Sequence, residues 1–160
     1  ERESVLEDLD AIITSLPGPV VLVGHSLGGY LGLAHALTRP GVLAGLVLVS
    51  TGPGFRDPAA REAWNDRVRE SMSGYGIEPV AAEIGFHADS MVIDRLTELT
   101  LPITMVIGGE DKAYLGANDY MERKLPHASR TTVDGARHYV MRSHPADVAT
   151  AVRTVTAQLT

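Results

Sequence analysis

Cysteine is absent from the 160-residue sequence, aromatic residues make up only 5% of it, and no long apolar run is present. Without cysteine the chain cannot form disulfides, thiolate zinc sites or a cysteine nucleophile, and this composition fits a reducing cytoplasm. A membrane-spanning helix needs roughly 20 consecutive apolar residues, and no segment approaches that length. We therefore expect a cytoplasmic protein with no membrane partner.

Charge of one sign is not concentrated anywhere in the chain. The sequence has 14 Lys and Arg against 20 Asp and Glu, a formal net charge of −6, and its basic residues are scattered. With two Phe and one Trp, it offers neither the basic surface nor the stacking side chains that nucleic acid requires. The sequence contains no His-Glu-x-x-His motif and no cluster of metal-ligand residues, so nothing in it indicates a metal site. We predict no nucleic-acid partner, no metal and no cofactor.

The N-terminal segment has neither a signal-peptide pattern nor an initiator Met. Residues 1–13, ERESVLEDLDAII, are acidic and amphipathic, whereas a signal peptide places basic residues before an apolar stretch. The chain is therefore expected either to be processed or to begin inside a longer one.

What is present is an alternation of strand and helix patterns. Short all-apolar runs bounded by Pro or Gly are typical of strands buried on both faces of a parallel sheet, and segments with helical spacing lie between them. Strands of this kind are predicted at 20–23, 46–49 and 103–107, and a less apolar strand is predicted at 130–133. Helices are predicted at 4–16, 27–39 and 145–159. This alternation predicts an α/β fold in which helices cover both faces of a parallel sheet.

The stretch from 51 to 100 interrupts the alternation. It opens with a Gly- and Pro-rich segment, after which Asp57 is expected to cap a helix with Pro58 in its first turn. We interpret 51–100 as a short helical cap inserted between two core parts, residues 1–50 and 101–160. Five large apolar side chains of this stretch either line a pocket or pack the insertion onto the sheet: Trp64, Met72, Tyr75, Phe86 and Met91.

A Gly-x-Ser-x-Gly pattern stands between the strand at 20–23 and the next helix. Gly24, Ser26 and Gly28 form it, and it is typical of a serine nucleophile on a sharp strand-to-helix turn. Side chains two positions before and after the serine are expected to collide at such a turn, and glycine removes the collision. Ser26 is therefore the predicted nucleophile. The alternative is an incidental serine at an ordinary junction.

A serine hydroxyl needs a base to take its proton. The sequence has six candidates: His25, His35, His87, His127, His138 and His144. We favour His138, because it lies just after the last strand, and open α/β sheets place their sites at the carboxyl ends of strands. His25 is expected to support the turn beside Ser26. His144, which is expected to cap the last helix, is the competing base.

The imidazole in turn needs a buried acceptor that holds it in the correct tautomer. Asp111 follows the strand at 103–107 through Gly108-Gly109-Glu110, again at a carboxyl end. We favour Asp111 as this acid, with Glu110 and Asp134 as the alternatives.

Three motifs together resemble those of the α/β-hydrolase superfamily: GHSLGG after VVLV, GGED after a strand, and GARHYV before a helix that begins with Pro. The resemblance is greatest to small esterases, lactonases and C–C hydrolases. It implies a three-layer parallel-sheet fold with Ser26 as nucleophile, Asp111 as acid and His138 as base, the order in which that family carries its triad. It also implies that the amide N–H of Leu27 donates to the oxyanion.

The resemblance is incomplete on the N-terminal side. The family sheet has eight strands, and this chain supplies what correspond to the last four, so the fold is expected to be truncated. The family's second oxyanion donor comes from a loop upstream of these strands. The strand at 20–23 would then present an apolar edge without a neighbour, which favours self-association.

The sequence predicts a serine hydrolase that acts on a small apolar ester or a related acyl substrate through an acyl-enzyme on Ser26. Two alternatives stay open because the same geometry serves several purposes. One is a catalytically weak hydrolase-fold module that binds an apolar ligand or a partner protein. The other is a triad enzyme for C–C cleavage or perhydrolysis.

Overall fold

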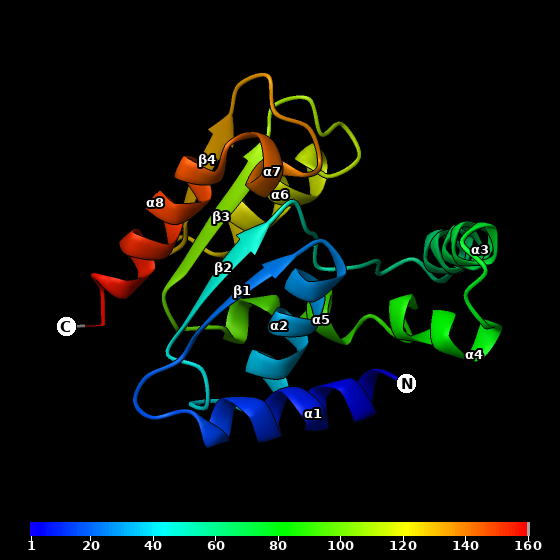
Figure 1. The fold of residues 1–160 in the computed structure, drawn as a ribbon, viewed down its shortest axis with the longest axis horizontal. Helices are drawn as coiled ribbons and strands as arrows, with labels where there is room; N and C mark the ends of the chain where they lie inside the picture. The colour runs from blue at the N-terminus through cyan, green and yellow to red at the C-terminus, as the bar shows by residue number, and fades with distance from the viewer. Residues whose placement is uncertain (160) are drawn as a thin grey trace.

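Four parallel strands form the centre of the molecule (Figure 1). The computed structural model describes residues 1–159, without the side chain of Pro79. The strands are β1 (Val21–His25), β2 (Gly45–Val49), β3 (Ile103–Gly108) and β4 (Ser129–Val133), and they lie in the order β1-β2-β3-β4. Because all neighbours are parallel, the carboxyl ends of the four strands meet at one edge of the sheet. The predicted α/β fold is confirmed.

Helices cover both faces of the sheet, which gives three layers. Leu46 and Leu48 of β2 pack into one core cluster, whereas the alternating Val47 and Val49 pack into a second cluster on the opposite face. Each of the four is at most 1% exposed. The first cluster includes α1 (Arg2–Ser15) and α2 (Leu27–Thr38), and the second includes α7 (Val140–Ser143) and α8 (Pro145–Thr156). The all-apolar sequence of β2 follows from this burial on both faces.

The segment between β2 and β3 has two parts with different packing. Its elements are α3 (Pro58–Gly74), α4 (Pro79–Ala82), the 3-10 turn η1 (Glu83–Gly85), α5 (Met91–Arg95) and the 3-10 turn η2 (Leu96–Glu98). Asp57 caps α3 as predicted, since its carboxylate accepts from the amides of Ala59 and Ala60. Helices α3 and α4 stand away from the sheet (Figure 1). Val92 and Leu96, in contrast, belong to the core beside α2. The division at 50 and 100 stays a prediction, although only the first part of this segment stands apart.

The longest helix that was not predicted from the sequence is α6 (Leu115–Lys124). It contains Gly116, Asn118 and Asp119, which are weak helix formers. The helix is held by packing instead, because Met121 is fully buried against the core.

Strand β1 lies at one edge of the sheet among the described residues. Its Val23 side chain is 45% exposed. The expected self-association through this strand stays a prediction. Over residues 1–159, no helix combines the length and apolarity needed to cross a lipid bilayer.

Candidate active site

Ser26 lies on a strained turn between β1 and α2. Its φ is 52°, a left-handed value that is uncommon for a residue with a side chain. The turn is fixed to the neighbouring strand, because the Ser26 N–H donates to the carbonyl of Val49 over 2.9 Å. The expected strand–turn–helix context is therefore present, and the Ser26 side chain stands at the carboxyl edge of the sheet.

The steric reason given for the two glycines holds at only one of them. A Cβ on Gly24 would lie 2.5 Å from the carbonyl oxygen of Gly28, so this position admits no side chain without a backbone shift. A Cβ on Gly28 would meet nothing within 4 Å, which contradicts the prediction for that residue. The second close approach is at Gly29, where a Cβ would lie 2.6 Å from Thr51 Cγ2. The helix packs closely against the end of β2 at that point.

The structure brings Ser26, His138 and Asp111 into one hydrogen-bonded line. His138 Nε2 lies 3.1 Å from Ser26 Oγ, and His138 Nδ1 lies 2.9 Å from Asp111 Oδ2. An ionised carboxylate can only accept, so Nδ1 carries the proton and Nε2 is free to accept the serine proton. The Asp111 side chain is 5% exposed and the His138 side chain 28% exposed. The acid is thus buried while the imidazole remains accessible.

The loop that carries His138 docks directly on the loop that carries Asp111. The Glu110 N–H donates to the carbonyl of Ala136 over 2.9 Å, and Gly109 N–H donates to Val133 over 2.8 Å. Gly108 makes this approach possible, because a Cβ there would overlap the carbonyl of Ala136. The alternative acid Glu110 points elsewhere and pairs with Arg137 at the surface.

His25, beside the turn, and His144, at the start of the last helix, do not take the position of the base. His25 Nε2 lies 2.9 Å from the His138 carbonyl oxygen, so the His25 side chain contacts the loop that carries the base, whereas it was expected to support the turn beside Ser26. Burial lowers the pKa of His25. His144 occupies the N-cap position of α8, but its side chain makes no capping hydrogen bond and contacts Ser143 instead. The structure does not bring His144 to Ser26.

Two residues that sequence reasoning missed, Thr51 and Asn118, connect these loops. Thr51 Oγ1 donates to the carbonyl of Ser26 over 2.6 Å, and the buried Asn118 amide donates to the carbonyls of Thr51 and Tyr114 over 2.9 and 3.0 Å. Thr51 follows β2 at its carboxyl end, a position that could have drawn attention to it. Asn118 lies on the helix that was not predicted, so no signal pointed to it.

The comparisons with known proteins agree with the fold. A profile of the alpha/beta hydrolase family matches residues 2–151. The chain belongs to the alpha/beta hydrolase family. MenH from S. aureus shares the fold with a TM-score of 0.84 and 15% sequence identity, over 99% of this chain and 76% of MenH. A thermophilic esterase gives a TM-score of 0.76 at 20% identity, over 99% of this chain and 74% of the esterase.

The relatives of this chain found by sequence include a lipase and an esterase. Human monoglyceride lipase is 25% identical over 88% of this chain, which corresponds to 58% of the lipase. The pimeloyl-acyl-carrier-protein methyl ester esterase of Aromatoleum aromaticum is 26% identical over 91% of this chain and 77% of the esterase. The chain thus spans less than two thirds of the length of the human lipase.

Ser26, His138 and Asp111 line a cavity of about 580 Å³. Apart from the triad, its walls are mainly apolar and come from α2, α3, the loop after β2 and the segment around the start of α6. The larger apolar side chains are Leu27, Tyr30, Phe55, Trp64, Val68, Met72 and Tyr114. Of the five cap residues that were expected to line a pocket or pack the insertion, Trp64 and Met72 line this cavity. Tyr75 is 81% exposed, and Met91 packs against the core.

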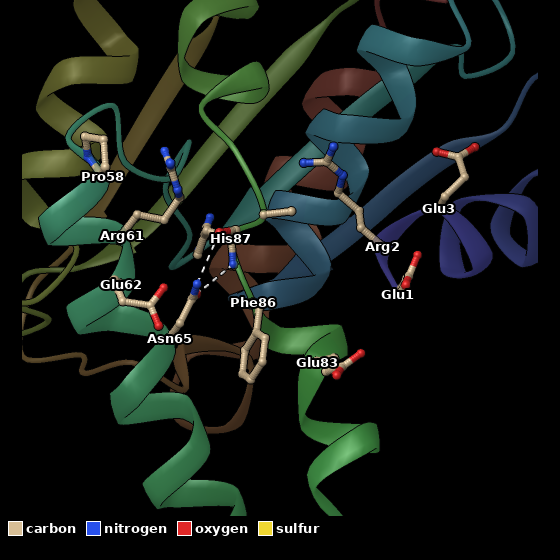
Figure 2. A pocket seen from close by; sticks show the side chains of 11 residues that line it. Glu1, Arg2, Glu3, Pro58, Arg61, Glu62, Asn65, Glu83, Phe86 and His87 are labelled. Carbon is tan, nitrogen blue, oxygen red and sulfur yellow. Dashed lines mark hydrogen bonds between the residues drawn. The ribbon is translucent and has the colours of Figure 1, made fainter.

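A second cavity of about 670 Å³ lies between the start of α1 and α3 (Figure 2). Phe86 lines it together with mostly charged side chains, and no triad residue does. His87 lines both cavities. Its backbone is held by Asn65 of α3, whose side chain accepts from the His87 N–H over 2.9 Å and donates to its carbonyl over 3.3 Å (Figure 2).

His87 is a neutral group in the wall between the cavities. It is 7% exposed, its ring meets those of Tyr30, Phe55 and Trp64, and burial lowers its pKa to about 4. Among residues 1–159, no group of three or more His, Asp or Glu side chains is arranged to hold a metal ion.

Proposed function

We propose that the chain is a serine hydrolase that cleaves carboxylic esters or related acyl compounds through an acyl-enzyme on Ser26. The observation that carries the proposal is the unbroken line from Asp111 through His138 to Ser26, at the mouth of an apolar cavity. A nucleophile, its base and the group that orients the base must lie in this relation for acyl transfer.

Formation of the acyl-enzyme follows from the tautomer of His138, in which Nδ1 carries the proton and Nε2 is free to accept one. His138 Nε2 takes the proton of Ser26 as Oγ bonds to the acyl carbon, and the Asp111 carboxylate stabilises the imidazolium that forms. The imidazolium then gives this proton to the leaving oxygen, and the C–O bond to the alcohol breaks. In the second half, His138 takes a proton from water, whose oxygen attacks the acyl carbon, and returns it to Oγ as the acid departs.

The negative oxygen of each tetrahedral intermediate needs donors, and Leu27 is placed to supply one. It is the first residue of α2, so its N–H points out of the helix N-terminus, where the partial charge is positive. Within the described part of the chain, this N–H donates to no other backbone group. Leu27 is therefore the proposed oxyanion donor.

The cavity walls indicate an ester with a small apolar part. Tyr30, Phe55, Trp64, Val68 and Met72 offer contact to hydrocarbon, and such walls usually provide affinity while a few polar groups fix orientation. The names of the lipase and the esterase described above support an ester substrate. A cytoplasmic location remains part of the prediction.

Labelling with a fluorophosphonate probe tests the proposal directly, because only an activated serine reacts rapidly. We expect fast labelling of the wild type, hydrolysis of p-nitrophenyl butyrate, and loss of both in Ser26→Ala. Removal of the nucleophile leaves only binding and oxyanion stabilisation, so kcat should fall by at least about 10³-fold.

The control is thermal unfolding of both proteins, which should match, because one hydroxyl contributes little to packing. A wild-type chain that folds, binds apolar ligands and neither labels nor hydrolyses esters would instead be a binding module.

A further inference from the structure

A single side chain separates the two cavities. Of the residues that the structure describes, His87 alone lines both the active-site cavity of about 580 Å³ and the second cavity of about 670 Å³. We propose that His87 sets the length limit of the substrate, because its imidazole closes the active-site cavity at the end away from Ser26 and blocks the way into the second cavity. This inference rests on the proposed hydrolase function and names what the site selects, the length of the acyl chain.

The acyl chain is the part of the substrate that the active-site cavity has to hold. It stays bonded to Ser26 Oγ from the attack on the ester until water releases the acid, whereas the alcohol departs after the first step. Ser26 lines the cavity, so the chain extends from there along its apolar walls. The longest chain that fits is therefore set by the wall that stops it.

A row of rings connects the catalytic base to His87. The Tyr114 ring stacks on that of His138 with centroids 5.0 Å apart, and the Trp64 ring meets that of Tyr114 at a centroid distance of 6.2 Å. Trp64 in turn meets His87 at 5.8 Å. His87 therefore lies at the far end of an aromatic wall that begins at the base.

The imidazole of His87 is fixed in this wall by packing. Its ring meets that of Tyr30 at a centroid distance of 4.1 Å and that of Phe55 at 5.5 Å. Asn65, which lines the second cavity, holds the His87 backbone through two hydrogen bonds (Figure 2). With 7% of the residue exposed, the ring has little free space around it. A close-packed group of this kind does not move aside without losing its contacts, so it stops the chain.

Hydrogen bonding does not explain why an imidazole stands at this position. His87 Nδ1 is buried without a hydrogen-bond partner among the described residues. Burial also lowers the pKa of the ring to about 4, so His87 is neutral at pH 7. Exchange for a phenyl ring therefore keeps a neutral ring in the wall and breaks no hydrogen bond at Nδ1.

The second cavity provides the room beyond the wall. Its lining is mostly charged, with Arg2, Arg61 and Glu62 among its side chains, so a hydrocarbon chain gains little affinity there. Removal of the imidazole should therefore act by relieving a clash. The expected sign is a change in the accepted chain length, without tighter binding of short chains.

The test compares kcat/KM for p-nitrophenyl esters from acetate to palmitate in the wild type and in His87→Ala. In the wild type, kcat/KM should rise as methylenes are buried. It should then fall by at least about 10-fold at the chain length that reaches His87, the scale of one methylene too many in a closed pocket. In His87→Ala the fall at that length should be absent.

Two variants control for the ring and for the cap. His87→Phe keeps a ring in the wall and should keep the length limit of the wild type. Phe86→Ala removes a ring from the neighbouring residue, which lines the second cavity and not the active-site cavity. It should enlarge the second cavity without opening the wall, so the length limit should again be that of the wild type.

Four results would overturn the role of His87: no length limit in the wild type, an unchanged limit in His87→Ala, a limit that is lost equally in His87→Phe, or one that is lost equally in Phe86→Ala. The last would show that a loosened cap admits the chain. If His87→Ala does not unfold cooperatively, His87→Thr replaces it, and it should show a smaller shift in the same direction. An inactive wild type that no fluorophosphonate labels would instead refute the proposed function itself.

Discussion

The two sides of the active-site cavity are built in different ways. On one side, backbone hydrogen bonds join the turn after β1 to the end of β2 and the loop after β3 to the loop after β4, and glycines allow contacts that no side chain could make. On the other side lies α3, in which Asn65 is the one buried residue. The reacting atoms are thus fixed by the rigid core, while the shape of the cavity depends on a helix with a small buried contact. Mutations on the core side should therefore change kcat or the free energy of unfolding, whereas mutations on the cap side should change how the free energy of unfolding depends on pH.

The largest effect is expected on the core side, from His138→Ala. Loss of the general base should lower kcat for p-nitrophenyl butyrate by at least about 100-fold. His144→Ala is the control, because the His144 side chain makes no capping bond to α8. It should retain activity and change the free energy of unfolding by less than about 0.5 kcal/mol. The reverse pattern would move the base to His144.

The next effect compares two glycines of the same motif. Gly24→Ala places a Cβ against the backbone of Gly28, which cannot move aside, so we expect a loss of about 1–3 kcal/mol in the free energy of unfolding. Gly28→Ala meets no atom and replaces a helical glycine, so it should be neutral or stabilising by up to about 1 kcal/mol. Urea denaturation of both variants checks this. Equal losses would show that the turn itself, and not the contact, requires glycine.

On the cap side the expected effect depends on pH and comes from His87. Its pKa is about 4 in the folded state and about 6.5 in an unfolded chain. The unfolded state therefore binds more protons between these values, and stability is lost as pH falls from about 6.5 toward about 4. At pH 5 the His87 contribution should cost about 2 kcal/mol relative to pH 7.5.

Urea denaturation at both pH values measures this cost, and His87→Phe should reduce the difference by that amount. His25 and His35 have lowered pKa values from burial and act in the same direction, so a smaller pH dependence should remain in the variant. A variant with the full pH dependence of the wild type would contradict the assignment to His87.

Most of the fold could be predicted because its signals are local. The four strands were placed within one or two residues of their bounds. For β2 the signal is clearest, since Leu46 to Val49 are apolar at every position when both faces are buried. α6 was missed for the converse reason. Gly116, Asn118 and Asp119 are weak helix formers in its first half, and Met121 packs into a core that the local sequence does not reveal.

The sequence by itself determined the chemical groups of the triad and their order along the chain: Ser26, Asp111 and His138 each follow a strand, and parallel strands bring such positions to one edge. Only the tertiary structure decided which residues support them. Thr51 and Asn118 are 67 positions apart, and Asn65 and His87 are 22 apart. The Tyr114 ring stacks on His138 only because β3 and β4 are assembled side by side. Local periodicity reports which face of an element is buried. It carries no information on which distant backbone group a side chain will meet.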